Sequence, residues 1–120
     1  MRATGKQELG RAGEDLAARW YVEHGYEVVD RNWRCSTGEL DIVARRGRLT
    51  VFCEVKTRSS NAFGTPAEAV GALKRLRGRR SAAAWFAARA TAGAGGAGGA
   101  VRFDVACVMG RSVTVIEDAF

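Results

Sequence analysis

Two carboxylates and one ammonium occur close together in the middle of the chain, at Asp41, Glu54 and Lys56. All three fall within residues 38–58, where two apolar runs flank a short basic turn that contains Gly47. Gly supplies the positive φ that tight turns need, so this segment predicts a β-hairpin. Because side chains alternate between the two faces of a strand, any loop of even length puts the three charged groups on one face.

The length of the hairpin loop decides how the two carboxylates meet. A two-residue loop pairs Asp41 with Phe52 and places it diagonal to Glu54, whereas a four-residue loop places Asp41 directly opposite Glu54. Carboxylates about 4.5–8 Å apart on adjacent strands repel each other unless a cation neutralises both. Mg²⁺ suits this position, because it prefers one or two carboxylates together with water and substrate phosphate.

A wet sheet face that carries charges for solubility is the simpler interpretation. Against it, Val43 and Phe52 share the charged face, so that face is partly covered, and a buried carboxylate needs a positive partner. The opposite face is apolar from Leu40 to Val55 and is expected to face the core. Lys56 is one of only three Lys among nineteen Lys and Arg residues. Its compact ammonium suits holding an attacking water or a developing phosphorane charge.

An Asp followed thirteen residues later by Glu-x-Lys resembles the PD-(D/E)xK motif of the restriction-endonuclease-like nuclease superfamily. More closely, the chain resembles the YraN-like family of small bacterial proteins, which are similar in turn to archaeal Holliday-junction resolvases. A lone triplet of this kind arises by chance, but here seven segments follow the family's order over nearly the whole chain. The segments are residues 10–14, 31–34, 38–43, 51–58, 63–66, 102–105 and 119–120.

This resemblance implies a restriction-endonuclease-like α/β fold, a mixed central β-sheet flanked by helices in the order αβββαββ. It also implies a metal-dependent, structure-selective DNA endonuclease that hydrolyses phosphodiester bonds in branched or flapped DNA. Mg²⁺ or Mn²⁺ would be held by Asp41, Glu54, the Val55 carbonyl and Glu14, while Lys56 positions the attacking water. Resolvases similar to this family act as dimers, so the resemblance also implies a homodimer.

The sequence leaves the role of two further carboxylates undecided between function and structure. Glu14 lies at the edge of the apolar stripe of the first helix, beside the small residue Gly10. It either completes the acidic site or pairs with Arg11 near the start of the helix, where an exposed pair contributes little. Glu39 shares the strand face of Asp41, and we expect it to be a supporting or solvated residue rather than a ligand.

The remaining pattern predicts a single domain over residues 1–120 with a mobile Gly-rich loop at about residues 91–100. Thr65 and Glu68 form a capping box around Pro66, which marks the start of the second helix. The first half of the chain is predicted to form a helix at residues 7–24, a strand at 26–29, a link at 31–34 and the hairpin. The second half is predicted to form a helix from 65 to about 86 and strands at 101–108 and 113–116. The second helix is expected to bend or split at Gly78.

Composition narrows the cellular setting and the partner. Three cysteines without a CxxC pair argue against disulfide and zinc frameworks. With no signal peptide and no apolar run of membrane-spanning length, the expected compartment is the cytoplasm and no membrane partner is expected. A net charge of +6 and a pI near 9.9 favour a polyanion such as nucleic acid.

Basic side chains gather in the hairpin and in the second helix. Such a run is ordinarily the solvated side of a helix, but in a basic chain with a candidate phosphodiester site we favour contact with backbone phosphates. The candidate phosphate-binding residues are Arg45, Arg46, Arg48, Arg58, Lys74, Arg75, Arg77, Arg79 and Arg80.

Two other functions fit the same residues. The first is a catalytically silent nucleic-acid-binding module of the same fold, which would keep salt-sensitive binding without cleavage. The second is a scaffold whose acidic residues are merely solvated, which would bind no specific metal.

Overall fold

The computed structural model describes residues 5–58, 72–91 and 99–119. The capping box predicted at residues 65–68 and most of the Gly-rich loop predicted at residues 91–100 lie outside these ranges. Within them the elements follow the predicted order αβββαββ. They are α1 (Gly5–Glu23), β1 (Glu27–Cys35), β2 (Gly38–Arg46), β3 (Leu49–Thr57), α2 (Ala72–Thr91), β4 (Val101–Met109) and β5 (Ser112–Ile116).

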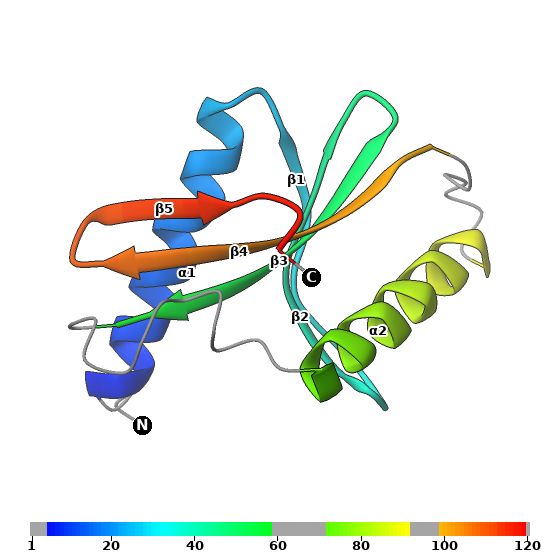
Figure 1. Ribbon diagram of the computed structural model, residues 1–120, viewed down its shortest axis with the longest axis horizontal. Coiled ribbons are helices and arrows are strands. Elements are labelled where there is room, and N and C mark those ends of the chain that lie inside the picture. The colour runs from blue at the N-terminus through cyan, green and yellow to red at the C-terminus, as the bar shows by residue number, and fades with distance from the viewer. Residues whose placement is uncertain (1–4, 59–71, 92–98, 120) are drawn as a thin grey trace.

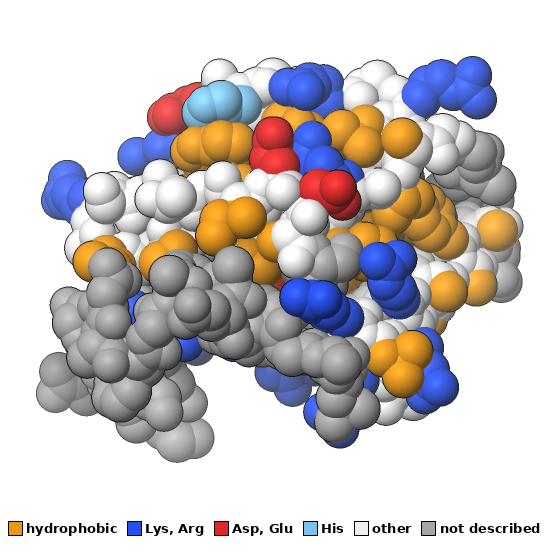
Figure 2. Space-filling model, viewed as in Figure 1, with side chains coloured by type: hydrophobic (Ala, Val, Ile, Leu, Met, Phe, Trp, Pro, Cys, Tyr) orange, Lys and Arg blue, Asp and Glu red, His pale blue; other side chains and the backbone are white. Residues whose placement is uncertain are grey.

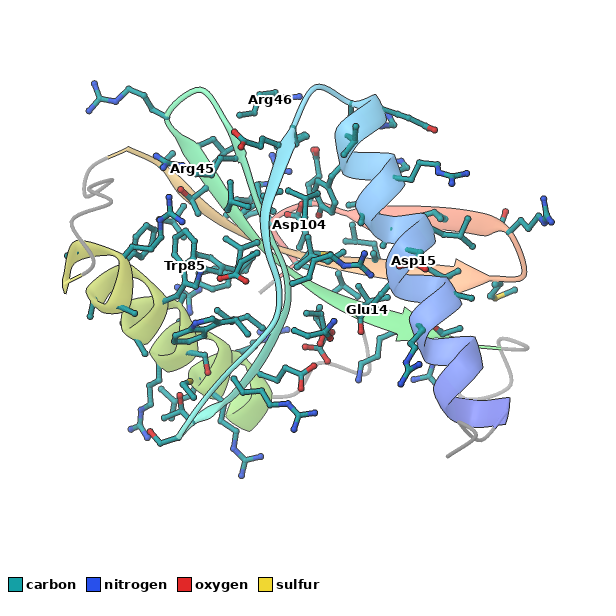
Figure 3. The ribbon with its side chains drawn as sticks, turned by 180° about the vertical axis from the view of Figure 1, so that it is seen from behind. Glu14, Asp15, Arg45, Arg46, Trp85 and Asp104 are labelled. Atoms are coloured by element: carbon teal, nitrogen blue, oxygen red, sulfur yellow. The ribbon has the colours of Figure 1, made fainter. Side chains whose placement is uncertain are left out.

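All five strands belong to one sheet with the order β1-β2-β3-β4-β5. β3 and β4 run parallel, and the other neighbours are antiparallel, so the sheet is mixed as predicted. Parallel neighbours need a crossover connection, and α2 lies in it (Figure 1). From behind, α1 and α2 are seen on opposite sides of the sheet (Figure 3). The predicted α/β class, with a mixed sheet flanked by helices, is confirmed.

Each helix covers its own apolar core. The α1-side core contains Tyr21 and Ile42, both without exposed surface. In the α2-side core, Phe52 meets Trp85 edge to face, with ring centroids 5.6 Å apart. The indole Nε1 of Trp85 donates a hydrogen bond to Asp30 of β1 at 3.0 Å, which ties α2 to the edge strand. Burial of a side chain of this size contributes about 1.5–3 kcal/mol, so packing on both faces holds the sheet between the helices.

Several boundaries differ from those expected. β1 continues to Cys35, so residues 31–34 form strand rather than a link. These residues pair with β2, and cross-strand pairing outweighs the weak strand propensity of Arg and Asn. β2 likewise continues through Arg46, which the sequence placed in the turn. α2 runs through Gly78 without interruption, so the split expected there does not occur.

The hairpin register settles the alternative that the sequence left open. The turn contains two residues, Gly47 and Arg48, and Gly47 has the expected positive φ of 59°. Ile42 pairs with Cys53, and this last pair of the ladder is the one next to Asp41 and Glu54. The two-residue loop therefore gives the register that was expected only of a longer loop, because the turn begins one residue later than assumed.

The alternation of side chains is interrupted where Asn32 of β1 faces Asp41 of β2. On one side of Asn32 and Asp41 lies the pair Arg31–Ile42, which faces α1. On the other side lies the pair Trp33–Leu40, which packs in the α2-side core. Residues two apart on a regular strand would share a face. Asn32 has a left-handed φ of 51°, which accounts for the change of face in β1. The prediction that Leu40 faces the same core as Ile42 is therefore wrong.

A buried carboxylate ties the second half of the sheet to α1. Asp104 of β4 has no exposed surface and accepts hydrogen bonds from the Tyr21 hydroxyl at 2.7 Å and the Asp118 backbone N–H at 3.1 Å. The guanidinium of Arg102 binds both of its oxygens at 2.8 Å. Arg102 also donates to the Tyr26 hydroxyl at 3.0 Å. Burial is the main reason that the pKa of the Tyr21 phenol is raised, so the hydroxyl stays protonated as a donor.

Replacement of Asp104 should therefore affect stability. Asp104→Asn leaves the Arg102 guanidinium without its buried counter-charge and should lower the free energy of unfolding by about 3–5 kcal/mol. Tyr21→Phe removes a single hydrogen bond and should cost about 1 kcal/mol. Urea unfolding followed by circular dichroism measures both. Equal stability of Asp104→Asn and wild type would contradict the structural role assigned to this carboxylate.

Candidate active site

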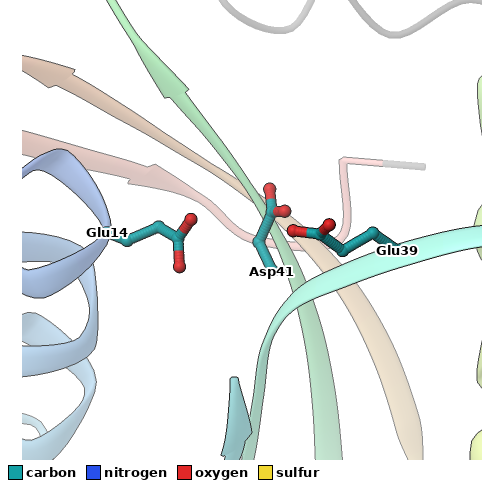
Figure 4. A group of neighbouring side chains, drawn as sticks. All are labelled: Glu14, Glu39 and Asp41. Carbon is teal, nitrogen blue, oxygen red and sulfur yellow. The ribbon is translucent and has the colours of Figure 1, made fainter. Parts of the chain in front are cut away.

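Three carboxylates converge near the interrupted rung. Glu14 of α1, Glu39 of β2 and Asp41 of β2 each offer one oxygen, and these oxygens lie within 4.8 Å of one another. Figure 4 shows Asp41 between the other two side chains, with Glu14 reaching in from the helix. Oxygens bound to one Mg²⁺ at about 2.1 Å lie about 3–4 Å apart, so small side-chain movements would fit this group to such an ion.

A glycine brings the helix that carries Glu14 close to the sheet. Gly13 packs against Thr57 at the end of β3, and a Cβ built at Gly13 would collide with the Thr57 hydroxyl. The close approach lets the adjacent Glu14 reach Asp41 across the sheet surface. The sequence left Glu14 open between an active and a structural role, and the fold places it in the acidic group.

Asp41 lies where β2 and β3 cease to pair. Its Oδ2 accepts a hydrogen bond from the Val55 backbone N–H at 2.8 Å, in place of the next main-chain bond of the ladder. Burial, followed by the negative charge of Glu54, raises the pKa of Asp41 from 3.8 to about 7, although the bond from Val55 opposes this shift. Glu14 and Glu39 raise it further. At neutral pH the Asp41 carboxylate is therefore held in an environment that disfavours its charge.

The other two residues of the predicted triplet also lie together. Lys56 Nζ is 3.3 Å from Glu54 Oε1, and both side chains are mostly buried, with 24% and 19% exposed. Glu54 is close enough to Asp41 to be the second cause of its raised pKa. The structure thus brings Asp41, Glu54 and Lys56 together, and Glu39, which the sequence had favoured as a supporting or solvated residue, is exposed at the acidic group.

The negative charge of the Glu14 carboxylate is only partly neutralised by its neighbours. Asn32 donates a side-chain hydrogen bond to its carboxylate, and the Arg31 guanidinium lies 3.7 Å from Oε1. Burial nevertheless raises the pKa of Glu14, and these two favourable contacts offset only part of the effect. Within the described part of the chain, the buried Oε1 accepts no hydrogen bond. Arg31 binds Asp15 more closely, at 2.7 Å.

A pocket of about 1060 Å³ lies beside the acidic group, between α2 and the β1–β2 turn. We call it the α2 pocket. The carboxylates of Glu39, Asp41 and Glu54 line it together with Leu40, Phe52 and Phe103. Basic and hydroxyl side chains line the rest of the wall, from Arg34, Thr37, Arg77, Arg80 and Ser81.

The predicted phosphate-binding residues divide into two groups. Arg77 and Arg80 line the α2 pocket, and Arg75 and Arg79 are exposed on the same helix. Figure 2 shows blue side chains over the region that α2 occupies in Figure 1. Arg58 follows β3 at the site end of the sheet, and the side chain of Lys74 lies outside the described set.

The second group lies far from the acidic residues. Arg45, Arg46 and Arg48 sit at the turn end of the hairpin, and Figure 3 shows Arg45 and Arg46 well apart from Glu14. Arg46 also packs over the Tyr26 ring, with its guanidinium carbon 4.2 Å from the centroid, and donates to the His24 carbonyl. These three arginines therefore do not lie beside the acidic group. No helix in the described ranges is long and apolar enough to cross a membrane.

Comparison with known proteins shows the family. Residues 13–108 match the model of the uncharacterised protein family UPF0102, and the chain belongs to that family, the YraN-like family suggested by the motifs. A UPF0102 protein of Beutenbergia cavernae is 60% identical over 72% of each chain. One of Frankia casuarinae is 52% identical over 90% of this chain and 86% of its own. One of Moorella thermoacetica is 48% identical over 86% of this chain and 82% of its own.

Sequence reasoning missed several residues that the fold brings to the site. Asn32 and Arg31 bind Glu14, while Arg34 pairs with Glu39, with 2.9 Å between Nε and Oε2. All three basic or amide residues belong to the segment 31–34, which the sequence treated as a link. A usable signal was present, because Asn is among the few non-Gly residues that readily adopt a left-handed backbone within a strand.

Neutralising Asp41 should stabilise the metal-free protein. The folded-state pKa is raised, so the native state binds more protons than the unfolded state between about pH 4 and 7 and loses stability as the pH rises through that window. Asp41→Asn keeps an acceptor for the Val55 N–H and should raise the unfolding free energy at pH 8 by about 1–3 kcal/mol, with little difference from wild type at pH 4. Thermal and urea unfolding at both pH values, with exposed Glu27→Gln as the matched control, measure the effect. Destabilisation by Asp41→Asn at pH 8 would contradict it.

Two substitutions at Asn32 separate its backbone from its amide. Both Asn32→Gly and Asn32→Ala remove the hydrogen bond to Glu14, but only Ala is strained by the left-handed φ. We expect the Ala variant to be less stable than the Gly variant by about 1–2 kcal/mol. Urea unfolding of the two proteins measures this difference directly. Equal stabilities would mean that the strand does not need the left-handed conformation at this position.

Proposed function

We propose that this protein is a metal-dependent DNA endonuclease with a restriction-endonuclease-like fold. The observation that carries the proposal is the convergence of Glu14, Glu39 and Asp41 within 4.8 Å, beside the Glu54–Lys56 pair. The element order αβββαββ and the mixed sheet agree with the fold that the resemblance implies. Branched or flapped DNA in the cytoplasm is the proposed setting.

The residues present fit a Mg²⁺ or Mn²⁺ ion. Carboxylate oxygens are the ligands that these hard cations prefer. Asp41 carries a raised pKa because like charges surround it, and Glu14 Oε1 accepts no hydrogen bond in the described part of the chain. A divalent cation would relieve both conditions. Val55 donates its N–H to Asp41, and since the N–H and C=O of one strand residue point to the same side, its carbonyl is directed to that side of β3.

Each residue then has a distinct role in hydrolysis. Bound metal would stabilise negative charge on the phosphate and lower the pKa of an attacking water. Asp41, Glu54 and the Val55 carbonyl would hold the metal, and Glu14 and Glu39 would complete the acidic surroundings. Lys56, kept beside Glu54, donates hydrogen bonds to the attacking water or to a phosphate oxygen as charge develops. The arginines of α2 contact the DNA backbone next to the reacting phosphodiester.

Cleavage and metal binding test the proposal together. Wild type should cut labelled flapped, branched or single-stranded DNA in Mg²⁺ or Mn²⁺ and not in EDTA, and Asp41→Asn, Glu54→Gln or Lys56→Ala should each slow cutting by about 10²-fold or more. Mn²⁺ should raise the melting temperature of wild type but not of Asp41→Asn, because binding to the native state adds stability. Glu27→Gln, an exposed acid on β1, is the matched control and should behave as wild type in both assays.

The results also discriminate the alternatives. No cutting of any substrate, together with salt-sensitive DNA binding, would overturn the nuclease proposal in favour of a silent binding module. The exposed arginines of α2, which do not depend on the carboxylates, are the observation that favours such a module. If Mn²⁺ does not stabilise the protein and DNA does not bind, the remaining alternative is a scaffold whose acidic group binds no ligand.

A further inference from the structure

The α2 pocket changes in charge from one end to the other. Asp41 and Glu54 line the end next to the acidic group, and Arg77 and Arg80 of α2 line another part of the wall. Negative side chains cannot hold the phosphates that flank a reacting phosphodiester, whereas guanidinium groups bind them well. The pocket therefore has one region suited to a metal-bound phosphate and one suited to its neighbours along the strand.

The volume of the pocket limits what can enter. At about 1060 Å³ it lies just above the range for small-molecule sites, about 300–1,000 Å³, and has room for a few nucleotides. A DNA duplex, whose major groove alone is about 12 Å wide, is too large to enter such a space. An unpaired strand fits because it is narrow and its backbone can bend between α2 and the β1–β2 turn.

The remaining wall suits an unstacked base. The hydroxyls of Thr37 and Ser81 lie 2.9 Å apart, and hydroxyls can donate or accept hydrogen bonds at the edge of a base. Arg34 is exposed over 82% of its side chain, and a guanidinium plane can stack on a base that has left the helix. These contacts are available to a base in a single strand and are closed to one inside a duplex.

We propose that the α2 pocket is a subsite for an unpaired DNA strand, in which Arg77 and Arg80 hold the phosphates next to the one presented to Asp41 and Glu54. This inference rests on the proposed function and narrows its substrate. Flaps and single strands are preferred over an intact duplex or a fully paired junction, because only an unpaired strand reaches the carboxylates through the pocket.

Binding to paired charge variants tests the subsite. Fluorescence anisotropy with a twelve-nucleotide oligo(dT) and a matching duplex is measured in Mg²⁺ on an Asp41→Asn background, where cutting does not interfere. Arg77→Gln/Arg80→Gln should weaken oligo(dT) binding roughly tenfold to a hundredfold and lower the slope of log K against log salt by about 1.4. Arg19→Gln/Arg48→Gln removes the same charge from exposed residues outside α2 and outside the pocket wall, and should change binding less than about threefold.

A cysteine in the pocket wall reports where the strand lies. Cys35 is half-buried there, whereas Cys53 and Cys107 are buried, with 4% and 6% exposed. Burial raises the pKa of the Cys35 thiol, but hydrogen bonds with Ser81 and Thr37 outweigh it and the net pKa is lowered, which favours reaction with N-ethylmaleimide. Bound oligo(dT) should slow this alkylation several-fold, and the duplex should not. Cys35→Ser, which should lose the rapidly alkylated thiol, identifies the signal.

The outcomes separate this inference from the proposed function. Metal-dependent cutting of duplex and single strand at equal rates, with the two double variants alike, would overturn the subsite and leave the nuclease intact. If oligo(dT) protects Cys35 from alkylation only when Arg77 and Arg80 are present, and wild type cuts no DNA in any metal, the subsite is supported and the nuclease proposal is overturned. Oligo(dT) binding that leaves Cys35 alkylation unchanged would place the strand elsewhere and overturn the subsite.

Discussion

The rung formed by Asn32 and Asp41 is the constraint on which the candidate site depends. Regular strands would send Glu39 and Asp41 to the α2 side of the sheet and leave Glu14 alone on the other side. The left-handed backbone at Asn32 and the end of pairing between β2 and β3 change the faces at this point, so that acids from β2 and α1 meet. A change of backbone conformation at one rung thus assembles a group that neither strand nor helix could form alone.

Such a group lowers the stability of the metal-free fold. Several carboxylates share a partly buried space, and the pKa of Asp41 near 7 shows that its charge is disfavoured there. Among the described residues, Arg31 at 3.7 Å and the amide of Asn32 partly neutralise Glu14, while Arg34 pairs with Glu39 and Lys56 pairs with Glu54. Buried like charges that are retained at an energetic cost are typical of sites whose task is to bind a cation or shift a proton.

The sequence predicted the element order, the hairpin, and the proximity of Asp41, Glu54 and Lys56, because these depend on local periodicity and strand pairing. It could not predict the face of Leu40, since one left-handed residue on the neighbouring strand reverses the alternation. It also grouped the basic residues as candidate phosphate contacts without locating them relative to the acidic group. Spacing along the chain does not reveal that Arg46 lies at the far end of the hairpin, stacked on Tyr26.

The repulsion among the carboxylates of the acidic group is tolerated because the network around Asp104 holds the neighbouring elements in place. Asp104 is fully buried on β4, and its two oxygens accept hydrogen bonds from α1, from Arg102 of β4 and from the segment after β5. A charged group satisfied on all sides fixes the positions of the elements that contact it. With α1 anchored there through Tyr21, the helix cannot easily move away to relieve the repulsion that Glu14 feels. The Asp104 network thereby keeps the acidic group assembled without touching it.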